Sequence, residues 1–235
     1  MGLPRGQTPR PQAQAPAPID VVVLDVDGTV ATCPIDFSAM REQVARIASR
    51  HGFDVASLGV RGVIEQIDQA AALLGANGQS FREEAEGAVE AIELAAAGDA
   101  RLLPGAAEAL AELRRSGLAV ALITRNCRGA AAVVLRDLGE YDALLTRDDV
   151  PRIKPDPDHV HRSLAALGRS PDRAAMVGDH DFDMQAGRAA GVQLCVGVRT
   201  GSGQDAGLLA AGAHVVIDSL ADLPRLLRER RGQAP

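Results

Sequence analysis

Two kinds of hydrophobic pattern alternate along this chain. Short, continuous apolar runs are typical of strands buried on both faces of a parallel sheet. These runs cover residues 21–24, 118–123, 143–145, 174–177, 193–198 and 214–217. Between most of them, apolar residues recur at helical spacing and stop at glycine or proline. Strands that alternate with helices predict right-handed βαβ units, so we expect an α/β fold with a doubly wound, Rossmann-like parallel sheet.

One long interval, residues 35 to 98, contains no strand-like run and shows three helical patterns. The first starts near Asp36 and stops at Gly52, and the second stops at Gly75. The third opens with a capping-box pattern at residues 80–83 and ends before Gly98. We therefore expect a small bundle of helices, inserted after the first strand as a domain of residues 35–98.

The remaining chain divides into a tail and a core. Residues 1–18 are rich in proline, glutamine and alanine and lack a long apolar segment, which predicts a disordered tail and argues against a signal peptide. Residues 19–34 and 99–235 are expected to form the core domain. Apolar runs stay far below the roughly 20 residues that a membrane span needs, so no membrane partner is expected.

Composition narrows the class of protein. Of the 235 residues, 46% are hydrophobic and 24% are charged, which is ordinary for a soluble globular protein. The net charge of −6 argues against a nucleic-acid partner held by its phosphates. The three cysteines have no metal-binding spacing and indicate reduced thiols in a cytoplasmic protein.

Two acidic residues end the first predicted strand. Asp25 follows the apolar run directly and Asp27 comes two residues later, so both point to the same face, roughly 6 to 7 Å apart. Gly28 and Thr29 then break the strand. An alternative is that Asp27 and Gly28 form an ordinary hairpin turn. That alternative leaves Asp25 unexplained, because an acid at the end of a buried strand is costly unless it is paired.

Two other strands also end in polar residues. The strand at 118–123 is followed by Thr124, Arg125 and Asn126, and the strand at 174–177 is followed by Asp179 and Asp183. In an open parallel sheet, ligands bind beyond the carboxyl ends of the strands. Taken singly, Thr124 can be a helix N-cap, and the two aspartates can be a turn followed by a solvated helix face.

The third element of the candidate site is Lys154. It is the only lysine, beside 24 arginines. A composition that otherwise uses arginine for its positive charges indicates that this position needs a compact point charge. The alternative is a chance leftover. The residues after it, Pro155 and Asp156, belong to a loop, and Asp156 is expected to cap a helix whose first residue is Pro157.

These stations resemble, in order and rough spacing, the four motifs of the haloacid dehalogenase superfamily of phosphohydrolases, from residue 19 to about 228. The resemblance implies that Asp25 is the nucleophile and Asp27 the acid/base. It implies that Thr124 binds phosphate, that Lys154 is the basic group, and that Asp179 and Asp183 belong to the metal motif. The inserted helices resemble the cap of phosphoglycolate-phosphatase-like members.

The implied reaction is hydrolysis of a small phosphorylated metabolite through an aspartyl-phosphate. Converging carboxylates repel one another unless a cation intervenes, and Mg²⁺ is the natural oxygen-loving choice. Asp25, Asp179 and the backbone carbonyl of Asp27 are expected to bind it, with Asp183 orienting the shell. The phosphoryl oxygens are expected to contact Lys154, the loop of residues 124–126 and the amides near Gly28. A sugar phosphomutase and a catalytically idle binding protein remain alternatives.

Four further features of the sequence allow more than one interpretation. Arg41 lies beside apolar Met40 on the first inserted helix, where it can bind a second anionic group of the substrate or simply be a solvated surface arginine. Residues 201–206 superficially fit a dinucleotide fingerprint, with a glycine-rich turn as the alternative. Cys127 is expected to be a small buried thiol, with a place near the site as the alternative. His180 is expected to shape the loop after Asp179, with a contact to the substrate as the alternative. The oligomeric state is left open.

Overall fold

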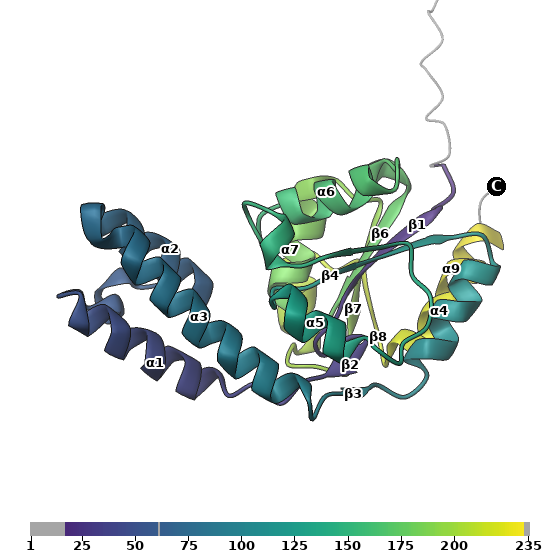
Figure 1. Cartoon of the computed structure of the whole chain (residues 1–235). Coiled ribbons are helices and arrows are strands. Elements are labelled where there is room, and N and C mark those ends of the chain that lie inside the picture. The colour runs from purple at the N-terminus through teal and green to yellow at the C-terminus, as the bar shows by residue number, and fades with distance from the viewer. Residues whose placement is uncertain (1–16, 61, 233–235) are drawn as a thin grey trace, which may run out of the picture.

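The computed structural model describes residues 17–60 and 62–232. These residues form a six-stranded sheet in which every pairing is parallel, in the order β5-β4-β1-β6-β7-β8 (Figure 1). The strands are β1 (Val21–Asp25), β4 (Ala119–Ile123), β5 (Ala143–Leu145), β6 (Ala174–Gly178), β7 (Leu194–Val198) and β8 (Val215–Ile217). The chain proceeds outward from β1 to β5 and then from β6 to β8, so the direction of winding switches at β1. The predicted doubly wound α/β fold is confirmed.

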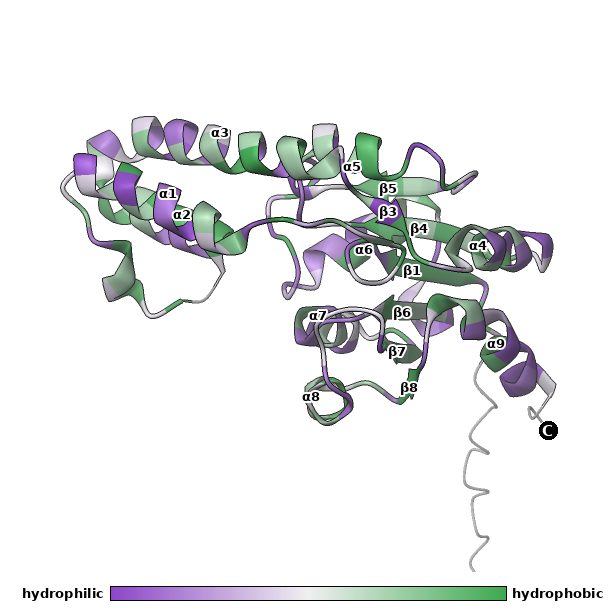
Figure 2. Cartoon of the chain, turned by 90° about the horizontal axis from the view of Figure 1, so that it is seen from below, coloured by the Kyte–Doolittle hydropathy of each residue, from purple (hydrophilic) through white to green (hydrophobic). Residues whose placement is uncertain are grey.

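Alternation along β1 divides the core into two layers. Val22 and Leu24 belong to the apolar cluster on one face of the sheet, and Val21 and Val23 belong to the cluster on the other. All five residues of β1 are buried, which explains why its sequence is continuously apolar up to Asp25. Figure 2 shows the apolar strands between helices that carry hydrophilic residues.

Helices cover both faces of this sheet. Residues of α4 (Ala106–Arg115), α5 (Arg128–Val134) and α9 (Leu223–Gly232) belong to the first cluster. Residues of α6 (Asp158–Ala166), α7 (Asp181–Ala190) and α8 (Asp205–Ala211) belong to the second. Short 3₁₀ turns occupy Val55–Leu58, Gly75–Asn77, Arg147–Asp149, Pro171–Arg173 and Leu220–Asp222.

The helical unit, defined as α1 (Phe37–Arg50), α2 (Val63–Leu73) and α3 (Gly78–Ala97), packs around an apolar cluster of its own. Asp36 caps α1 as predicted, since its Oδ1 accepts hydrogen bonds from the amides of residues 38 and 39. The predicted capping box at Ser80 is wrong, because α3 begins earlier, at Gly78. A Cβ at Gly78 would lie 2.0 Å from the Ala71 carbonyl oxygen, so a close approach between helices sets this boundary.

A short antiparallel pair joins the two connections between the sheet and the helical unit. It consists of β2 (Ala31–Thr32) and β3 (Arg101–Leu102), which lie side by side although the helical unit separates them in sequence (Figure 1). Strands of two residues carry no readable period, so the hydrophobic pattern did not predict them.

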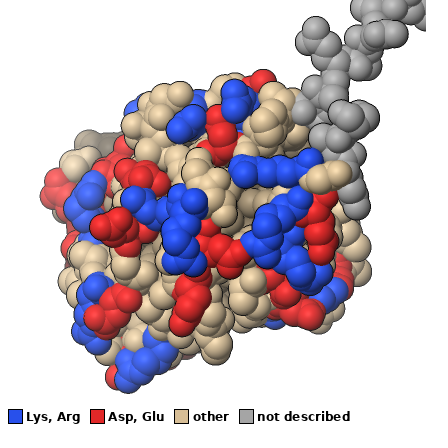
Figure 3. Space-filling view, turned by 90° about the vertical axis from the view of Figure 1, so that its right-hand side faces the viewer, with Lys and Arg blue, Asp and Glu red and all other residues tan. Residues whose placement is uncertain are grey.

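Other expectations can be placed directly. The Oδ1 atom of Asp156 accepts a hydrogen bond from the Asp158 amide, but α6 begins at Asp158, one residue later than expected. Within the described ranges, no helix combines the length and apolar character that a membrane crossing requires. Positive and negative side chains lie next to one another on the face seen in Figure 3. Residues 1–16 of the predicted tail lie outside the described residues.

Candidate active site

Lys154 and Asp25 form the buried centre of the site. Asp25 ends β1, between β4 and β6, and is 6% exposed, while Lys154 is 1% exposed. The Lys154 Nζ donates to Oδ1 of Asp25 and, at 2.6 Å, to Oδ1 of Asp183. Burial by itself lowers the pKa of Lys154, but the carboxylates of Asp183 and Asp25 outweigh burial and raise that pKa above its usual value. The lysine is therefore charged and paired with both acids.

Three buried carboxylates converge beside this lysine. Oxygen atoms of Asp25, Asp179 and Asp183 lie within 4.8 Å of one another. Burial has the largest effect on the pKa of Asp25 and raises it. The effect of Lys154 is second in size and lowers the pKa, and repulsion from the other aspartates raises it further, so the pKa is raised overall. Burial and the neighbouring Asp183 likewise raise the pKa of Asp179. Such a donor set, made only of oxygen atoms, fits a hard cation of the Mg²⁺ kind. Asp183, on α7, is buried, so the alternative of a solvated helix face is wrong.

The side chain of Asp27 lies outside that trio and faces the loop after β4. Its Oδ2 accepts hydrogen bonds from Asn126 Nδ2 at 2.8 Å and from Thr124 Oγ1 at 3.4 Å. Its Oδ1 is buried and has no hydrogen-bond partner among residues 17–60 and 62–232. Burial, more than any other cause, raises the pKa of Asp27 to about 6. A carboxyl group with that pKa can both give and take a proton near neutral pH. Thr124 does not cap α5, whose N-cap is Cys127.

Glycines let a second loop close over Asp179. Ser202 donates to Asp179 Oδ2 from its amide at 2.7 Å and from its hydroxyl at 3.1 Å. A Cβ at Gly201 would lie 2.0 Å from Asp179 Oδ2, and one at Gly28, whose φ is +84°, would lie 2.6 Å from Asp179 Cγ. The glycine pattern at 201–203 is therefore the predicted alternative, a glycine-rich turn, and it packs on an acidic side chain. Ser202 was not predicted from the sequence, although the glycines on either side of it are a local signal for this turn.

Arg125 bridges the loop after β4, the lysine loop and the helical unit. Its Nη1 donates to the Lys154 carbonyl at 2.8 Å, and its Nη2 donates to Glu65 Oε2 of α2 at 2.8 Å. The guanidinium also stacks over the Phe182 ring, 4.8 Å from the ring centre. These three contacts engage Arg125 within the protein, and its expected contact with phosphate stays a prediction.

A cavity of about 710 Å³ lies between the acidic cluster and the helical unit. The helical unit contributes apolar residues to its wall, among them Phe37, Met40 and Ile64. Arg41 lines the same cavity, is exposed, and forms no ion pair with any described residue. His180 also lines it, and its Nδ1 accepts a hydrogen bond from the Phe182 amide at the start of α7, so it shapes the loop as expected.

The fold and the site together define a class of protein before any relative is considered. A doubly wound parallel sheet that gathers acidic side chains and one buried lysine at the carboxyl ends of its strands is an α/β enzyme core with oxygen donors suited to a cation. The family model described as haloacid dehalogenase-like hydrolase matches residues 19–191. The chain therefore belongs to the haloacid dehalogenase-like hydrolases, and the resemblance inferred from its motifs is confirmed.

Similar proteins agree with this assignment. A Cupriavidus necator protein named phosphoglycolate phosphatase, plasmid, is 31% identical over 229 residues, which cover 91% of this chain and 95% of that protein. A Bacillus cereus protein named pyrophosphatase PpaX is 32% identical over 52% of this chain and 57% of its own length. The solved structure of a hydrolase from Pseudomonas syringae superposes with a TM-score of 0.62 at 24% identity and covers 89% of this chain and 98% of its own, which shows the shared fold.

Proposed function

We propose that the protein is a Mg²⁺-dependent phosphatase that hydrolyses a small phosphate monoester through an aspartyl-phosphate on Asp25. The observation that carries the proposal is the position of Asp25 at the end of β1. There it is hydrogen-bonded to Lys154, lies beside Asp179 and Asp183, and faces a cavity large enough for a small metabolite. The name phosphoglycolate phosphatase, carried by a relative that aligns along almost the whole chain, supports phosphate-ester hydrolysis.

Each residue has a role in the proposed reaction. A carboxylate oxygen of Asp25 attacks phosphorus, an Asp25–phosphorus bond forms, and the bond from phosphorus to the leaving oxygen breaks. Asp27 gives its proton to that oxygen, and later takes one from the water that cleaves the aspartyl-phosphate. Its pKa of about 6 suits both tasks. Lys154 and Thr124, with the amides near Gly28, stabilise the charge that spreads over the phosphoryl oxygens.

The metal is assigned to the three converging carboxylates. Asp25 and Asp179 would bind Mg²⁺ together with the backbone carbonyl of Asp27, and Asp183 would orient the surrounding shell. The donor chemistry of these carboxylates fits Mg²⁺. Burial and mutual repulsion raise the pKa values of Asp25 and Asp179 in the absence of a cation, and a bound cation would offset the negative charge of both groups. Mg²⁺ bound there supplies positive charge that neutralises the phosphoryl oxygens.

The helical unit is assigned as a cap over the cavity. Its apolar wall excludes water from the leaving group. Among the described residues that line the cavity, Arg41 is the arginine without an ion pair, so it is available for an anionic group on the substrate. In this proposal the substrate is a phosphorylated metabolite with a second anion, either a carboxylate or a phosphate. Arg41 would discriminate such a substrate from an uncharged phosphate ester.

The test is release of inorganic phosphate from a panel of phosphorylated metabolites and from p-nitrophenyl phosphate. Activity is expected with Mg²⁺, absent in EDTA, and restored when Mg²⁺ is added back. Release of free phosphate distinguishes a phosphatase from a phosphomutase, which returns the phosphoryl group to its substrate. Full turnover in chelator would overturn the metal assignment, and no release from any ester of the panel would overturn the phosphatase itself.

A further inference from the structure

Glu93 is an unusual residue of the helical unit because its charged side chain is buried. It lies near the end of α3 and is 3% exposed. Among the described residues of α1, α2 and α3, no other charged side chain is buried. A buried carboxylate is costly unless it is paired and hydrogen-bonded. The partners of Glu93 therefore explain why it is there.

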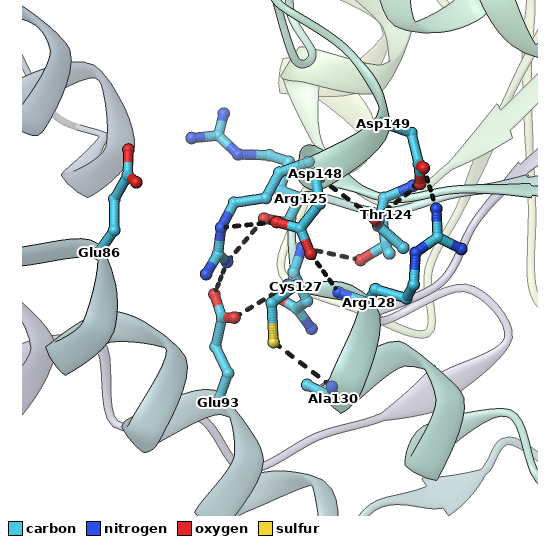
Figure 4. Close-up of polar contacts among 12 residues, drawn as sticks. Glu86, Glu93, Thr124, Arg125, Cys127, Arg128, Ala130, Asp148 and Asp149 are labelled. Carbon is cyan, nitrogen blue, oxygen red and sulfur yellow. Dashed lines mark hydrogen bonds and ion pairs between the residues drawn. The ribbon is translucent and has the colours of Figure 1, made fainter. Parts of the chain in front are cut away.

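Every side-chain partner of Glu93 among the described residues belongs to the core. Oε2 accepts a hydrogen bond from the Cys127 amide at 2.9 Å, and Oε1 accepts one from the guanidinium of Arg147. Figure 4 shows Glu93 extending from α3 toward Cys127. Arg147 in turn donates from Nη1 to the Arg125 carbonyl at 3.3 Å, and from its amide to the Asn126 carbonyl at 3.2 Å. The pair Glu93–Arg147 thus holds three consecutive residues of one loop by their backbone.

That loop, residues 124–127, carries the side chains assigned to the phosphoryl group. Asn126 donates to Asp27 at 2.8 Å, and the Asn126 amide donates to Thr124 Oγ1 at 3.2 Å. Displacement of such groups by about 1 Å can cost about 100-fold in rate. Whatever fixes the backbone of residues 125–127 therefore also fixes the side chains that contact Asp27.

Stability alone is a weak reason for this arrangement. Desolvation offsets much of the attraction in a buried ion pair, and an apolar pair of similar volume is often as stable. Apolar contact between α3 and α5 is also available, since Leu94 Cδ2 would lie 3.1 Å from a Cβ built on Gly129. A buried carboxylate is needed where a backbone amide and a guanidinium must be held at fixed positions.

We propose that Glu93 is a positioning residue, through which the helical unit holds loop 124–127 in the conformation that binds the phosphoryl group. Glu93 itself need not touch the substrate. The kinetic consequence of this assignment rests on the proposed phosphatase function, whereas the structural consequence does not. The experiment therefore has one arm of each kind.

The structural arm is amide hydrogen exchange on the full-length protein. In Glu93→Gln, the peptide that covers residues 124–130 is expected to exchange faster than in the wild type, because the Arg147 pairing is lost and the Cys127 amide has a weaker acceptor. The matched control is Glu86→Gln, two turns earlier on α3 (Figure 4). Its carboxylate pairs with Arg82 of the same helix. The control should leave the exchange of that peptide unchanged.

The kinetic arm uses p-nitrophenyl phosphate as substrate and inorganic phosphate as competitive inhibitor. Glu93→Gln is expected to lower kcat at least about tenfold and to raise the inhibition constant of phosphate, whereas Glu86→Gln changes neither. A loss of folded protein alone would lower kcat through the active fraction but leave the inhibition constant unaltered. That combination, or wild-type exchange in the loop, overturns the proposal.

Two outcomes need a second variant or a separate reading. If Glu93→Gln does not fold, Arg147→Lys replaces it, because lysine keeps the charge but its side chain ends one bond short of Arg147 Nη1, the atom that donates to both Glu93 and the Arg125 carbonyl. Arg147→Lys must then show the same faster exchange, and wild-type exchange there overturns the proposal. If the wild type releases no phosphate, the phosphatase proposal fails, and the exchange arm alone still decides the role of Glu93.

Discussion

Replacement of Asp27 by asparagine should make the metal-free protein more stable at neutral pH while removing the proposed acid/base of the reaction. Burial raises the pKa of Asp27 from 3.8 to about 6, with repulsion from Asp179 adding to it and Lys154 opposing it. In the unfolded chain the pKa of an aspartate is about 3.9. Between those two values the folded protein holds a proton that the unfolded chain has released.

The magnitude follows from the shift. A difference of about two pKa units corresponds to about 3 kcal/mol. Because the folded state binds more protons in this window, the free energy of unfolding falls as the pH rises from about 4 to about 6. The loss of stability due to Asp27 is therefore absent below about pH 4 and complete above about pH 6. Asparagine carries no charge, so the stability of Asp27→Asn minus that of the wild type should grow by up to about 3 kcal/mol. The partial exposure of Asp27 to the cavity makes this an upper figure.

The assay is urea unfolding in EDTA at several pH values between about 4 and 7, for the variant and the wild type. The difference between the two proteins cancels titrating groups that do not interact with Asp27. His159 is one such group, since burial lowers its pKa to about 4 and favours the opposite slope in both proteins. Asp137→Asn, at an exposed position, serves as the control for removal of one carboxylate and is expected to change stability little. A flat or falling difference for Asp27→Asn would refute the argument from burial.

Four other changes test the site. Mass spectrometry is expected to detect the proposed covalent phosphate adduct in the wild type and not in Asp25→Asn, and an adduct that persists would place the nucleophile elsewhere. Lys154→Arg should lower kcat/KM at least about tenfold, or about 1.4 kcal/mol, because a fork cannot replace one donor group shared by two carboxylates; unchanged kinetics would contradict this. Gly201→Ala puts a methyl carbon 2.0 Å from Asp179 Oδ2, so it should raise the Mg²⁺ concentration needed for half-maximal activity; an unchanged Mg²⁺ dependence would contradict this. Arg41→Ala should reduce turnover of the natural substrate but not of p-nitrophenyl phosphate, and equal effects would assign Arg41 to the surface.

The sequence predicted the core well because the strands are buried on both faces. Every residue of β1, β6 and β7 is buried, and such strands read as continuous apolar runs. Weaker local signals were misleading or absent. The pair β2 and β3 is too short for a period, and the start of α3 depends on contact between Gly78 and the preceding helix.

The residues of the candidate site also fall into two groups, those that the sequence predicted and those that it could not. Asp25, Lys154 and Asp179 could be found because each follows a strand or stands out in composition. The role of Glu93 could not be predicted from the sequence, since it depends on a contact with Arg147, which is 54 residues away in the sequence and in a different part of the fold. Ser202 depends in the same way on a loop that folds back onto Asp179. Contacts between distant segments leave no periodic trace along the chain.

Charge balance connects the core chemistry with recognition by the helical unit. Fully ionised, the four aspartates of the site and Lys154 sum to −3, from −4 and +1. One Mg²⁺ would bring that sum to −1, and a phosphate monoester dianion would return it to −3. Arg125 offsets little of this negative charge, because it is already paired with Glu65. Arg147 is likewise paired with Glu93. Arg41 is then the cavity arginine with no carboxylate partner among the described residues, so a second anion on the substrate would find its counter-charge there, at the wall formed by α1.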